Sequence, residues 1–310
     1  MNLKKPKFWD KKNSIFALLL FPVTLIVLII IFFKKKFTFI KDFNIPIICV
    51  GNIYIGGTGK TPTSILLANE LKELGMNPVI IRKYYKQHAD EHSLIINKFN
   101  NLILKDNRIE AIKEAKKKNF KTIILDDGLQ DYKIKKKLSI VCFHENQLIG
   151  NGYVIPSGPL RENLKSLRNV NIVLINGKKN LNFEKKLFKI NENLEVFYSY
   201  YKPLNIEEFK NKKLLALAGI ANPENFFTLL EKNNLEIKEK LIYPDHYEFS
   251  KTEIKKIIDM ADIKKMKIIM TEKDFFKINT FGLDNINYLK VSLEIINKEK
   301  LIDKIKRIYD

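Results

Sequence analysis

Residues 45–62 read IPIICVGNIYIGGTGKTP, and the pattern of this stretch decides the fold. Its first half is an apolar, β-branched run that is typical of a buried strand. A glycine-rich turn and Lys60-Thr61 come next, followed by a helical pattern that ends near Gly75, a residue well suited to the position just after a helix. A strand, a glycine turn, Lys-Thr and a helix in this order predict a phosphate-binding loop.

The residue types in this loop suit a nucleotide. Backbone N–H groups converge on a phosphate only where side chains do not block them, and the start of a helix adds free N–H donors and a partial positive charge. The lysine would supply a point charge to the β- and γ-phosphates, and the threonine hydroxyl would bind Mg²⁺. The predicted nucleotide-binding residues are Gly56, Gly57, Thr58, Gly59, Lys60 and Thr61.

The loop departs from the strict pattern. Tyr54 stands where that pattern has its first glycine, and Ile55 stands where membrane-partitioning ATPases have an early lysine. The alternative interpretation is an ordinary glycine-rich turn between a strand and a helix. We favour the phosphate loop because such a turn has no structural need for Gly-Lys-Thr.

Composition bounds the class of protein. The 310 residues are enough for one large or two ordinary domains, and a hydrophobic content of 45% indicates a globular body. The net charge of +20 favours an anionic partner, namely a membrane surface, a nucleic acid or a phosphorylated substrate, although general lysine enrichment explains part of it. Cys49 and Cys142 lie in apolar, strand-like runs and are expected as buried thiols of a reducing compartment.

The N-terminal region predicts a membrane anchor. Residues 14–33 read SIFALLLFPVTLIVLIIIFF, twenty residues without a charge, with lysines before and after them. A helix of this length spans the hydrocarbon core of a bilayer, about 30 Å thick. No small-residue cleavage site follows, so we expect an uncleaved segment. Lysines flank both ends, so two arrangements stay open: the segment crosses the membrane, or it dips in while both lysine clusters stay at the cytoplasmic surface.

Alternating strand and helix patterns predict an α/β fold with a P-loop NTPase-like parallel sheet. Expected strands occupy residues 78–82, 121–125, 138–143, 171–175 and 196–202, and a second series occupies 214–218, 235–243 and 267–271. Helices are expected over 107–118, 223–232, 251–261 and 296–309, whereas 83–101 reads as polar and irregular. The predicted organisation is a membrane anchor over 1–36, a P-loop kinase core over 37–202, and a smaller C-terminal α/β domain over 203–310.

Charged residues at strand ends and in loops are the candidates for the chemistry. Asp126 and Asp127 directly follow the strand over 121–125, where P-loop enzymes place an acid that binds Mg²⁺; an Asp-Asp-Gly turn that merely ends a strand is the alternative. Phosphoryl transfer also needs a group that takes the acceptor's proton. His246 and Asp90-Glu91 are candidates, although spacing alone reads them as a loop histidine and a solvated pair. These patterns indicate a membrane-anchored, NTP-using P-loop enzyme.

An ordered set of motifs resembles the tetraacyldisaccharide 4′-kinase family of the lipid A pathway. Each motif is weak alone, but together they cover most of residues 45–275. The motifs are VGN…GGTGKTP at 50–62, Asp90-Glu91, DDGLQ at 126–130, GNG…PSGPLRE at 150–162, AGIANPENFF at 218–227, PDHY at 244–247 and MTEKD at 270–274.

The resemblance implies transfer of the γ-phosphate of ATP to the 4′-hydroxyl of a tetraacyldisaccharide 1-phosphate, which gives lipid IVA. It implies an enzyme with Mg²⁺ at the cytoplasmic face of the inner membrane, in contact with membrane lipids, monomeric and without a nucleic-acid partner. By matching positions, Asp90 would be the catalytic base, assisted by His246, beside Lys60 of the phosphate loop. The remaining implied roles are metal binding by Thr61, Asp126, Asp127 and Glu162 and substrate binding by Arg108, Gln130 and Arg161.

Two positions depart from the family's motifs. Asp131 stands where the family usually has His after Asp-Asp-Gly-Leu-Gln, and residues 82–85 read Arg-Lys-Tyr-Tyr in place of Arg-Gly-Tyr-Gly. We expect altered acceptor contacts and retained chemistry. The competing hypothesis is a membrane-anchored P-loop regulatory ATPase without a small-molecule acceptor; the absence of a lysine at Ile55 argues against it.

Overall fold

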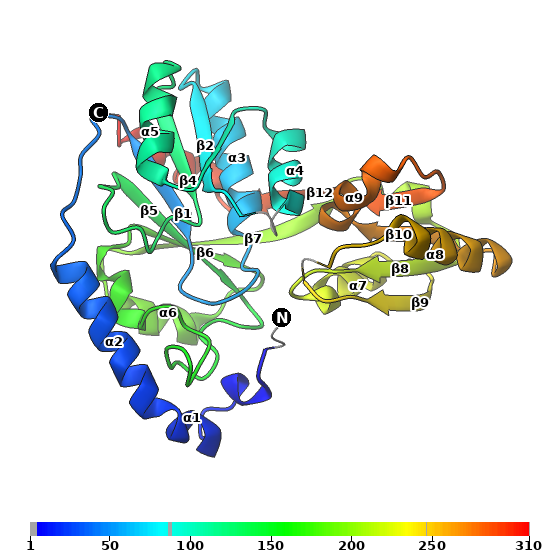
Figure 1. Cartoon of the computed structure of the whole chain (residues 1–310), viewed down its shortest axis with the longest axis horizontal. Coiled ribbons are helices and arrows are strands. Elements are labelled where there is room, and N and C mark those ends of the chain that lie inside the picture. Colours follow the sequence, from blue (N-terminus) through cyan, green and yellow to red (C-terminus); the bar gives the residue numbers. More distant parts are fainter. Residues whose placement is uncertain (1–4, 86–88, 246, 310) are drawn as a thin grey trace. The chain divides into compact units, whose positions relative to one another are not determined.

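The protein is described by a computed structural model, which covers residues 5–85, 89–245 and 247–309 (Figure 1). Contacts divide these residues into two units, and each is described by itself. The larger unit contains 5–84, 101–200 and 293–309, and the smaller contains 85, 89–100 and 201–292. The change of unit after residue 200 lies close to the predicted domain boundary. Residues 89–100 and 293–309, however, belong to units other than the predicted contiguous domains.

Within the described residues the main sheet has eight strands in the order β12-β7-β6-β5-β1-β4-β2-β3. The pairs from β3 across to β7 are parallel. In β1–β4 pairing Val50 lies opposite Asp126, which puts that carboxylate beside the strand end where the glycine-rich turn begins. The strands are β1 Ile47–Gly51, β2 Pro78–Lys83, β3 Leu102–Lys105, β4 Thr122–Asp126, β5 Leu138–His144, β6 Ile172–Asn176, β7 Glu195–Pro203 and β12 Val291–Ile295.

Helices cover both faces of this sheet. On one face α5 (Arg108–Lys117) buries Ala111, Ile112 and Ala115 against alternate residues of β1, β2 and β4. On the other face α3 (Lys60–Glu73) packs on the same three strands. Helix α6 (Leu181–Phe188) packs on β5 and β6, and α10 (Lys298–Lys306) joins α3 through the Lys298–Glu70 ion pair of 2.6 Å. The predicted α/β fold with a large parallel sheet is confirmed.

The smaller unit has its own parallel sheet, in the order β11-β10-β8-β9 within the described residues. Helix α7 (Pro223–Lys232) packs on one face and α8 (Lys251–Ile263) on the other, because alternate residues of β8 point to opposite sides. The remaining elements are β8 Leu214–Ala218, β9 Ile237–Ile242, β10 Lys267–Thr271, β11 Ile286–Leu289, α4 Ala89–Lys98 and α9 Glu272–Ile278.

The prediction of a polar, irregular segment over 83–101 is wrong. Ala89–Lys98 forms α4, which packs against α9 in the smaller unit. The apolar pattern of α4 is weak because Ile95 is its only fully buried aliphatic side chain, whereas the other buried residues, Asp90 and His92, are polar. Ion pairs between α4 and α9, which are far apart in the sequence, therefore stabilise α4. Such pairing leaves no periodic pattern in the local sequence.

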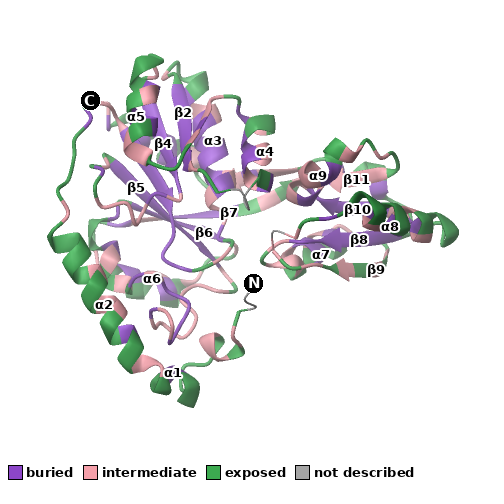
Figure 2. Ribbon diagram, viewed as in Figure 1, coloured by how far each residue is buried: buried purple, intermediate pink, exposed green. Residues whose placement is uncertain are grey.

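The apolar N-terminal segment forms two helices in place of one. Helix α1 spans Ile15–Leu19 and α2 spans Phe21–Lys36, with Leu20 between them and a proline in the first turn of α2. Across the part of the chain that the structure describes, no helix combines the length and the hydropathy that crossing a bilayer requires. A single bilayer-spanning helix over 14–33, one of the two arrangements that the sequence left open, is therefore not supported. Figure 2 shows much of α1 and α2 as exposed, although their residues are apolar.

Candidate active site

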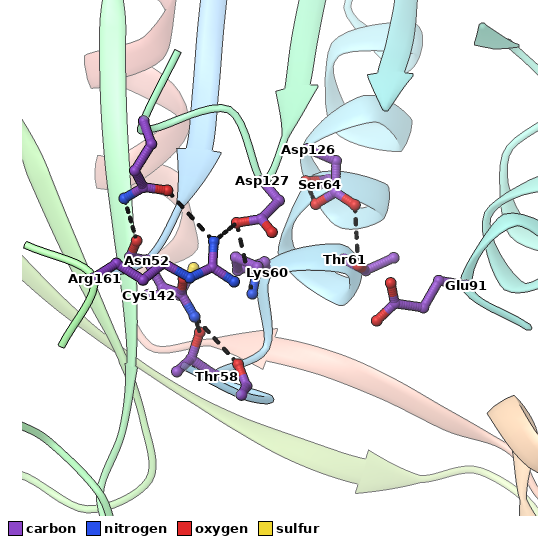
Figure 3. A network of polar contacts seen from close by, with 12 residues as sticks. Asn52, Thr58, Lys60, Thr61, Ser64, Glu91, Asp126, Asp127, Cys142 and Arg161 are labelled. Carbon is purple, nitrogen blue, oxygen red and sulfur yellow. Dashed lines mark hydrogen bonds and ion pairs between the residues drawn. The ribbon is translucent and has the colours of Figure 1, made fainter. Parts of the chain in front are cut away.

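The glycine-rich turn has the backbone of a phosphate-binding loop. Gly56 and Gly59 have φ of 121° and 91°, a region that residues with a Cβ rarely adopt, and Gly59 caps the N-terminus of α3. The buried Asn52 side chain holds the loop: its Nδ2 donates to the Gly56 carbonyl at 3.2 Å and to Thr58 Oγ1 at 3.0 Å (Figure 3). Hydrogen bonds from one buried side chain within the protein therefore hold the loop in this shape.

The structure explains why Tyr54 can replace the first glycine of the strict pattern. Tyr54 has a negative φ and is fully buried, so no glycine is needed there. It forms a β-bridge with Leu160, and the Ile55 N–H donates to the Pro159 carbonyl at 2.9 Å. The loop over 151–164 thus supports the phosphate loop from one side.

Thr61 and Asp126 meet, as predicted from the strand-end position of the acid. Thr61 Oγ1 donates to Asp126 Oδ2 at 3.0 Å, and Ser64 Oγ donates to Asp126 Oδ1 at 2.9 Å (Figure 3). The Arg82 guanidinium, at the end of β2, forms an ion pair with the same Oδ2 and also donates to Thr61 Oγ1 at 3.1 Å. Asp126 is fully buried and Arg82 is 5% exposed, so this is a desolvated charge pair.

The residues around Asp126 fit a magnesium ion that arrives with a phosphate. Mg²⁺ is usually held by one or two carboxylates together with substrate phosphates and water. The Thr61 hydroxyl and the Asp126 carboxylate, 3.0 Å apart at the first turn of α3, are that type of donor pair. Among the described residues no cluster of three or more His, Cys, Asp or Glu side chains could hold a metal ion.

Asp127 lies among cations at the mouth of the loop. Arg161 Nη1 donates to Asp127 Oδ1 at 2.9 Å, and Lys60 Nζ lies 3.8 Å from the same oxygen (Figure 3). Burial alone would raise the pKa of Asp127, but the charges of Lys60, Arg161 and Arg82 outweigh burial and hold this pKa below its usual value. Asp127 is therefore ionised at neutral pH and orients two cations that are suited to phosphate.

The predicted substrate-binding residues lie around the turn that contains Asp126 and Asp127. Arg108 Nη2 donates to the carbonyls of Asp126 and Asp127 at 3.1 and 2.8 Å, so it fixes the turn after β4. Its Nη1 lies 3.9 Å from Asp131, the residue that replaces the family's histidine. Gln130 Nε2 donates to the Asn52 carbonyl at 3.0 Å and to Glu162 Oε1 at 3.1 Å.

Glu162, predicted in the metal region, is 3% exposed and is held by protein donors. Besides Gln130 it forms an ion pair with Lys35 of α2. The Tyr132 hydroxyl also hydrogen-bonds to it, and burial together with the charge of Glu162 raises the pKa of this tyrosine. The structure thus ties this carboxylate to the apolar N-terminal helix.

The predicted base, Asp90, lies in the smaller unit. It is in the first turn of α4 and 3% exposed, and two lysines of α9 approach its Oδ2: Lys273 Nζ at 3.4 Å and Lys277 Nζ at 3.5 Å. Lys273 also lies 3.1 Å from Asp245 Oδ1 and 3.7 Å from Glu91 Oε1. Burial lowers the pKa of Lys273, but these three carboxylates outweigh it and raise the pKa. The predicted helper, His246, lies outside the described residues.

Sequence reasoning missed several polar residues that shape the site. Arg82 lies near the end of the buried strand β2, and the neighbouring strand β4 ends in Asp126. Opposite charges at the ends of two apolar strands were the available signal for this ion pair. Lys273 belongs to the MTEKD motif, which carried no assigned role. Asn52 belongs to the VGN motif, which likewise carried no assigned role, although its partners Gly56 and Thr58 are close in the chain. Nothing in the local pattern marks Ser64, because its partner Asp126 is brought near only by the folded sheet.

Comparisons with known proteins were made on this fold. The family model described as tetraacyldisaccharide-1-P 4′-kinase matches residues 16–310. A tetraacyldisaccharide 4′-kinase from Pelagibacter ubique is 41% identical over 315 residues, with 99% of each chain covered. One from Haemophilus influenzae is 32% identical over 284 residues and covers 86% of this chain and 83% of its own.

A similar fold is known from a crystal structure of LpxK from Aquifex aeolicus in complex with ATP. The two structures agree with a TM-score of 0.74 at 24% sequence identity, covering 95% of this chain and 99% of the other. At this level of identity the likeness concerns the fold. It extends over both units of the chain, and not over the phosphate-loop sheet alone.

Proposed function

The chain belongs to the tetraacyldisaccharide-1-P 4′-kinase family and is a phosphotransferase of that class, and we propose that it uses ATP and Mg²⁺ at the site around Lys60 and Asp126. The product of transfer to the 4′-hydroxyl is lipid IVA, in lipid A biosynthesis. The family match leaves the alternative, a regulatory ATPase without a small-molecule acceptor, without support.

In this proposal the residues of the site have distinct roles in binding and catalysis. The N–H groups of residues 56–61 and the Lys60 ammonium bind the β- and γ-phosphates. Thr61 and Asp126 hold the magnesium ion, which when bound neutralises charge on the phosphates. Arg161, oriented by Asp127, binds the transferred phosphate, while Arg108 and Gln130 keep the neighbouring turn in place for the sugar. Asp90, with His246, takes the proton of the acceptor hydroxyl.

A single observation carries this proposal. Thr61 Oγ1 and Asp126 Oδ2 lie 3.0 Å apart at the N-terminus of α3, directly after a loop with two glycines at positive φ. A hydroxyl from the first turn of the helix and an acid at the end of the adjacent parallel strand, placed at such a loop, are the parts that P-loop kinases use to hold nucleotide and metal.

Kinase activity tests the proposal directly. Purified protein with radiolabelled ATP and Mg²⁺ is expected to label a tetraacyldisaccharide 1-phosphate, as seen by thin-layer separation of the lipid product. Lys60→Met is expected to lower kcat by about 10²–10³-fold, because it removes a charge that stabilises the transferring phosphate.

The control for that variant is Lys72→Met, a change of the same kind in the exposed last turn of the same helix. It is expected to keep wild-type turnover. Hydrolysis of ATP that neither needs nor labels the disaccharide would contradict the kinase assignment and favour the ATPase.

We also propose that the protein works at the cytoplasmic face of the inner membrane, as a monomer, with α1 and α2 lying in the membrane surface. Eleven apolar side chains of these helices are between 45% and 73% exposed. Large exposed apolar patches mark interaction sites, and a helix can bury one such face in the headgroup region without crossing the bilayer. Lys34, Lys35 and Lys36 end α2, where they suit anionic headgroups.

Vesicle binding tests this part of the proposal. The double variant Ile26→Glu/Ile30→Glu changes side chains that are 57% and 59% exposed, so the fold is expected to be kept. In this proposal the two isoleucines are buried in the headgroup region of the membrane, and replacing them should weaken flotation with anionic vesicles by about tenfold or more. A matched control, Ile263→Glu/Ile296→Glu, changes isoleucines outside α1 and α2 that are 82% and 51% exposed. Equal loss of flotation in both variants would refute a specific role of α2.

A further inference from the structure

Helix α2 is seated on the larger unit by one face only. Thr24, Val27, Leu28, Ile31 and Lys35 follow each other at helical spacing and face the body of the unit. The side chains between them, on the other side of the helix, are exposed. The helix therefore has a docked face and a free apolar face.

Polar contacts hold the docked face at two points. Thr24 is 1% exposed; its Oγ1 lies 2.8 Å from Ser157 Oγ and accepts the Ser157 N–H at 3.1 Å. Eleven residues further, Lys35 forms its ion pair with the buried Glu162 and lies 5.0 Å from the Tyr132 ring centroid. A mainly apolar helix that makes buried polar contacts in this way is held in one register, since any shift would leave the partners unpaired.

Glu162 begins a chain of contacts that ends at the phosphate loop. Gln130 donates to Glu162 and to the Asn52 carbonyl, and Asn52 is the residue that shapes the loop. Arg161 Nη1 in turn lies 3.4 Å from Gln130 Oε1 and donates to Asp127, which pairs with Lys60. Each link joins residues of the larger unit, and each is a polar contact of a buried or half-buried side chain.

We propose that Lys35 is a positioning residue for phosphoryl transfer: by pairing with Glu162 it fixes Gln130 and hence the geometry of Arg161 and Asp127. This inference rests on the proposed function and deepens it, because it makes the seating of the membrane-facing helix a condition of catalysis. Without the ammonium, Glu162 keeps its burial but loses its countercharge, so its side chain and that of Gln130 rearrange. Arg161 then lacks one of its two fixed partners.

The neighbouring lysines provide the matched comparison. Lys36 is the next residue of the same helix and has the same charge, but its ammonium lies 5.9 Å from the ring centroid of Phe32 on its own helix. Lys35→Met and Lys36→Met therefore remove the same charge from the membrane-facing end. Only the first breaks the contact with Glu162.

The experiment measures kcat, KM for the lipid acceptor, flotation with anionic vesicles, and thermal unfolding for both variants. Lys35→Met is expected to lower kcat by about tenfold to a hundredfold, since small displacements of positioning groups have such effects. Lys36→Met is expected to keep kcat, and its loss of vesicle binding is expected to be no smaller than that of Lys35→Met, because the charge of Lys35 is already paired with Glu162. Lys35→Arg is expected to recover most of the kcat, because it restores the ion pair.

A double-mutant cycle with Glu162→Gln separates positioning from a general effect. The double variant Lys35→Met/Glu162→Gln is expected to be no slower than Glu162→Gln alone, since both changes break one contact. Equal kcat in Lys35→Met and Lys36→Met, or a kcat loss that only follows vesicle binding or unfolding, would overturn the inference. Wild-type protein that does not label the disaccharide would overturn the proposed function instead.

Discussion

Replacing Asp90 by Asn is expected to lower kcat by about 10²–10⁴-fold, the usual effect of losing a general base, while binding of ATP with Mg²⁺ stays unchanged. Asp90 is 3% exposed in the first turn of α4, and its carboxylate is held between the ammonium groups of Lys273 and Lys277. The amide is nearly isosteric, so packing is kept while the proton-accepting oxygen is lost. Acceptor turnover and equilibrium nucleotide binding, measured on the same preparation, separate the two effects.

Glu224→Gln is the control for this variant. Glu224 is also an acid in the first turn of a helix of the smaller unit, α7, but it is exposed and has no assigned role. We expect it to keep wild-type kcat. Wild-type turnover in Asp90→Asn would remove Asp90 from the role of base, and a loss of nucleotide binding in that variant would assign it to binding instead.

Replacing Arg82 by Met is expected to destabilise the larger unit by about 3–5 kcal/mol, the usual result of removing one partner of a buried ion pair. Asp126 is fully buried, and the Arg82 guanidinium is paired with its Oδ2. Without Arg82 a charged carboxylate stays in the core with only the hydroxyls of Thr61 and Ser64 as partners. Chemical unfolding followed by circular dichroism measures the change.

Two further variants make this result specific. Arg168→Met removes an exposed arginine at the end of a short 3₁₀ helix and is expected to change stability by less than about 0.5 kcal/mol. Arg82→Met/Asp126→Asn removes both charges and is expected to recover part of the lost stability. If Arg82→Met unfolds like Arg168→Met, Asp126 is not a desolvated charge and this interpretation of the pair fails.

The phosphate loop was predictable from the sequence because its determinants are local. Positive φ at Gly56 and Gly59, the capped start of α3 and the position of Asp126 after an apolar strand all depend on neighbours in the chain. The strand-end position of Asp126 likewise predicted that it meets Thr61. The contacts of Lys60 and Arg161 with Asp127 were not predicted, because the resemblance assigned these residues to the phosphate loop, the substrate site and the metal region separately.

The structure gives no support to a single bilayer-spanning helix over 14–33, one of the two arrangements that the sequence left open. Hydropathy counts apolar residues, but it does not register a break at Leu20 or a docked face built around one buried threonine. Helix α4 was missed because its apolar pattern is weak and its charge pairs with α9 join residues far apart in the sequence.

The sequence by itself therefore determined the strand, glycine-rich loop and helix around residues 47–73, the parallel α/β class and the acids at the strand ends, since each follows from residues within a few positions of one another. Only the tertiary structure decided which distant charges become partners: Arg82 with Asp126, Lys273 with Asp90, and Lys35 with Glu162. The physical reason is that a buried charge needs a countercharge from whichever element the fold places beside it. That choice depends on the packing of the sheet and its helices, and not on spacing along the chain.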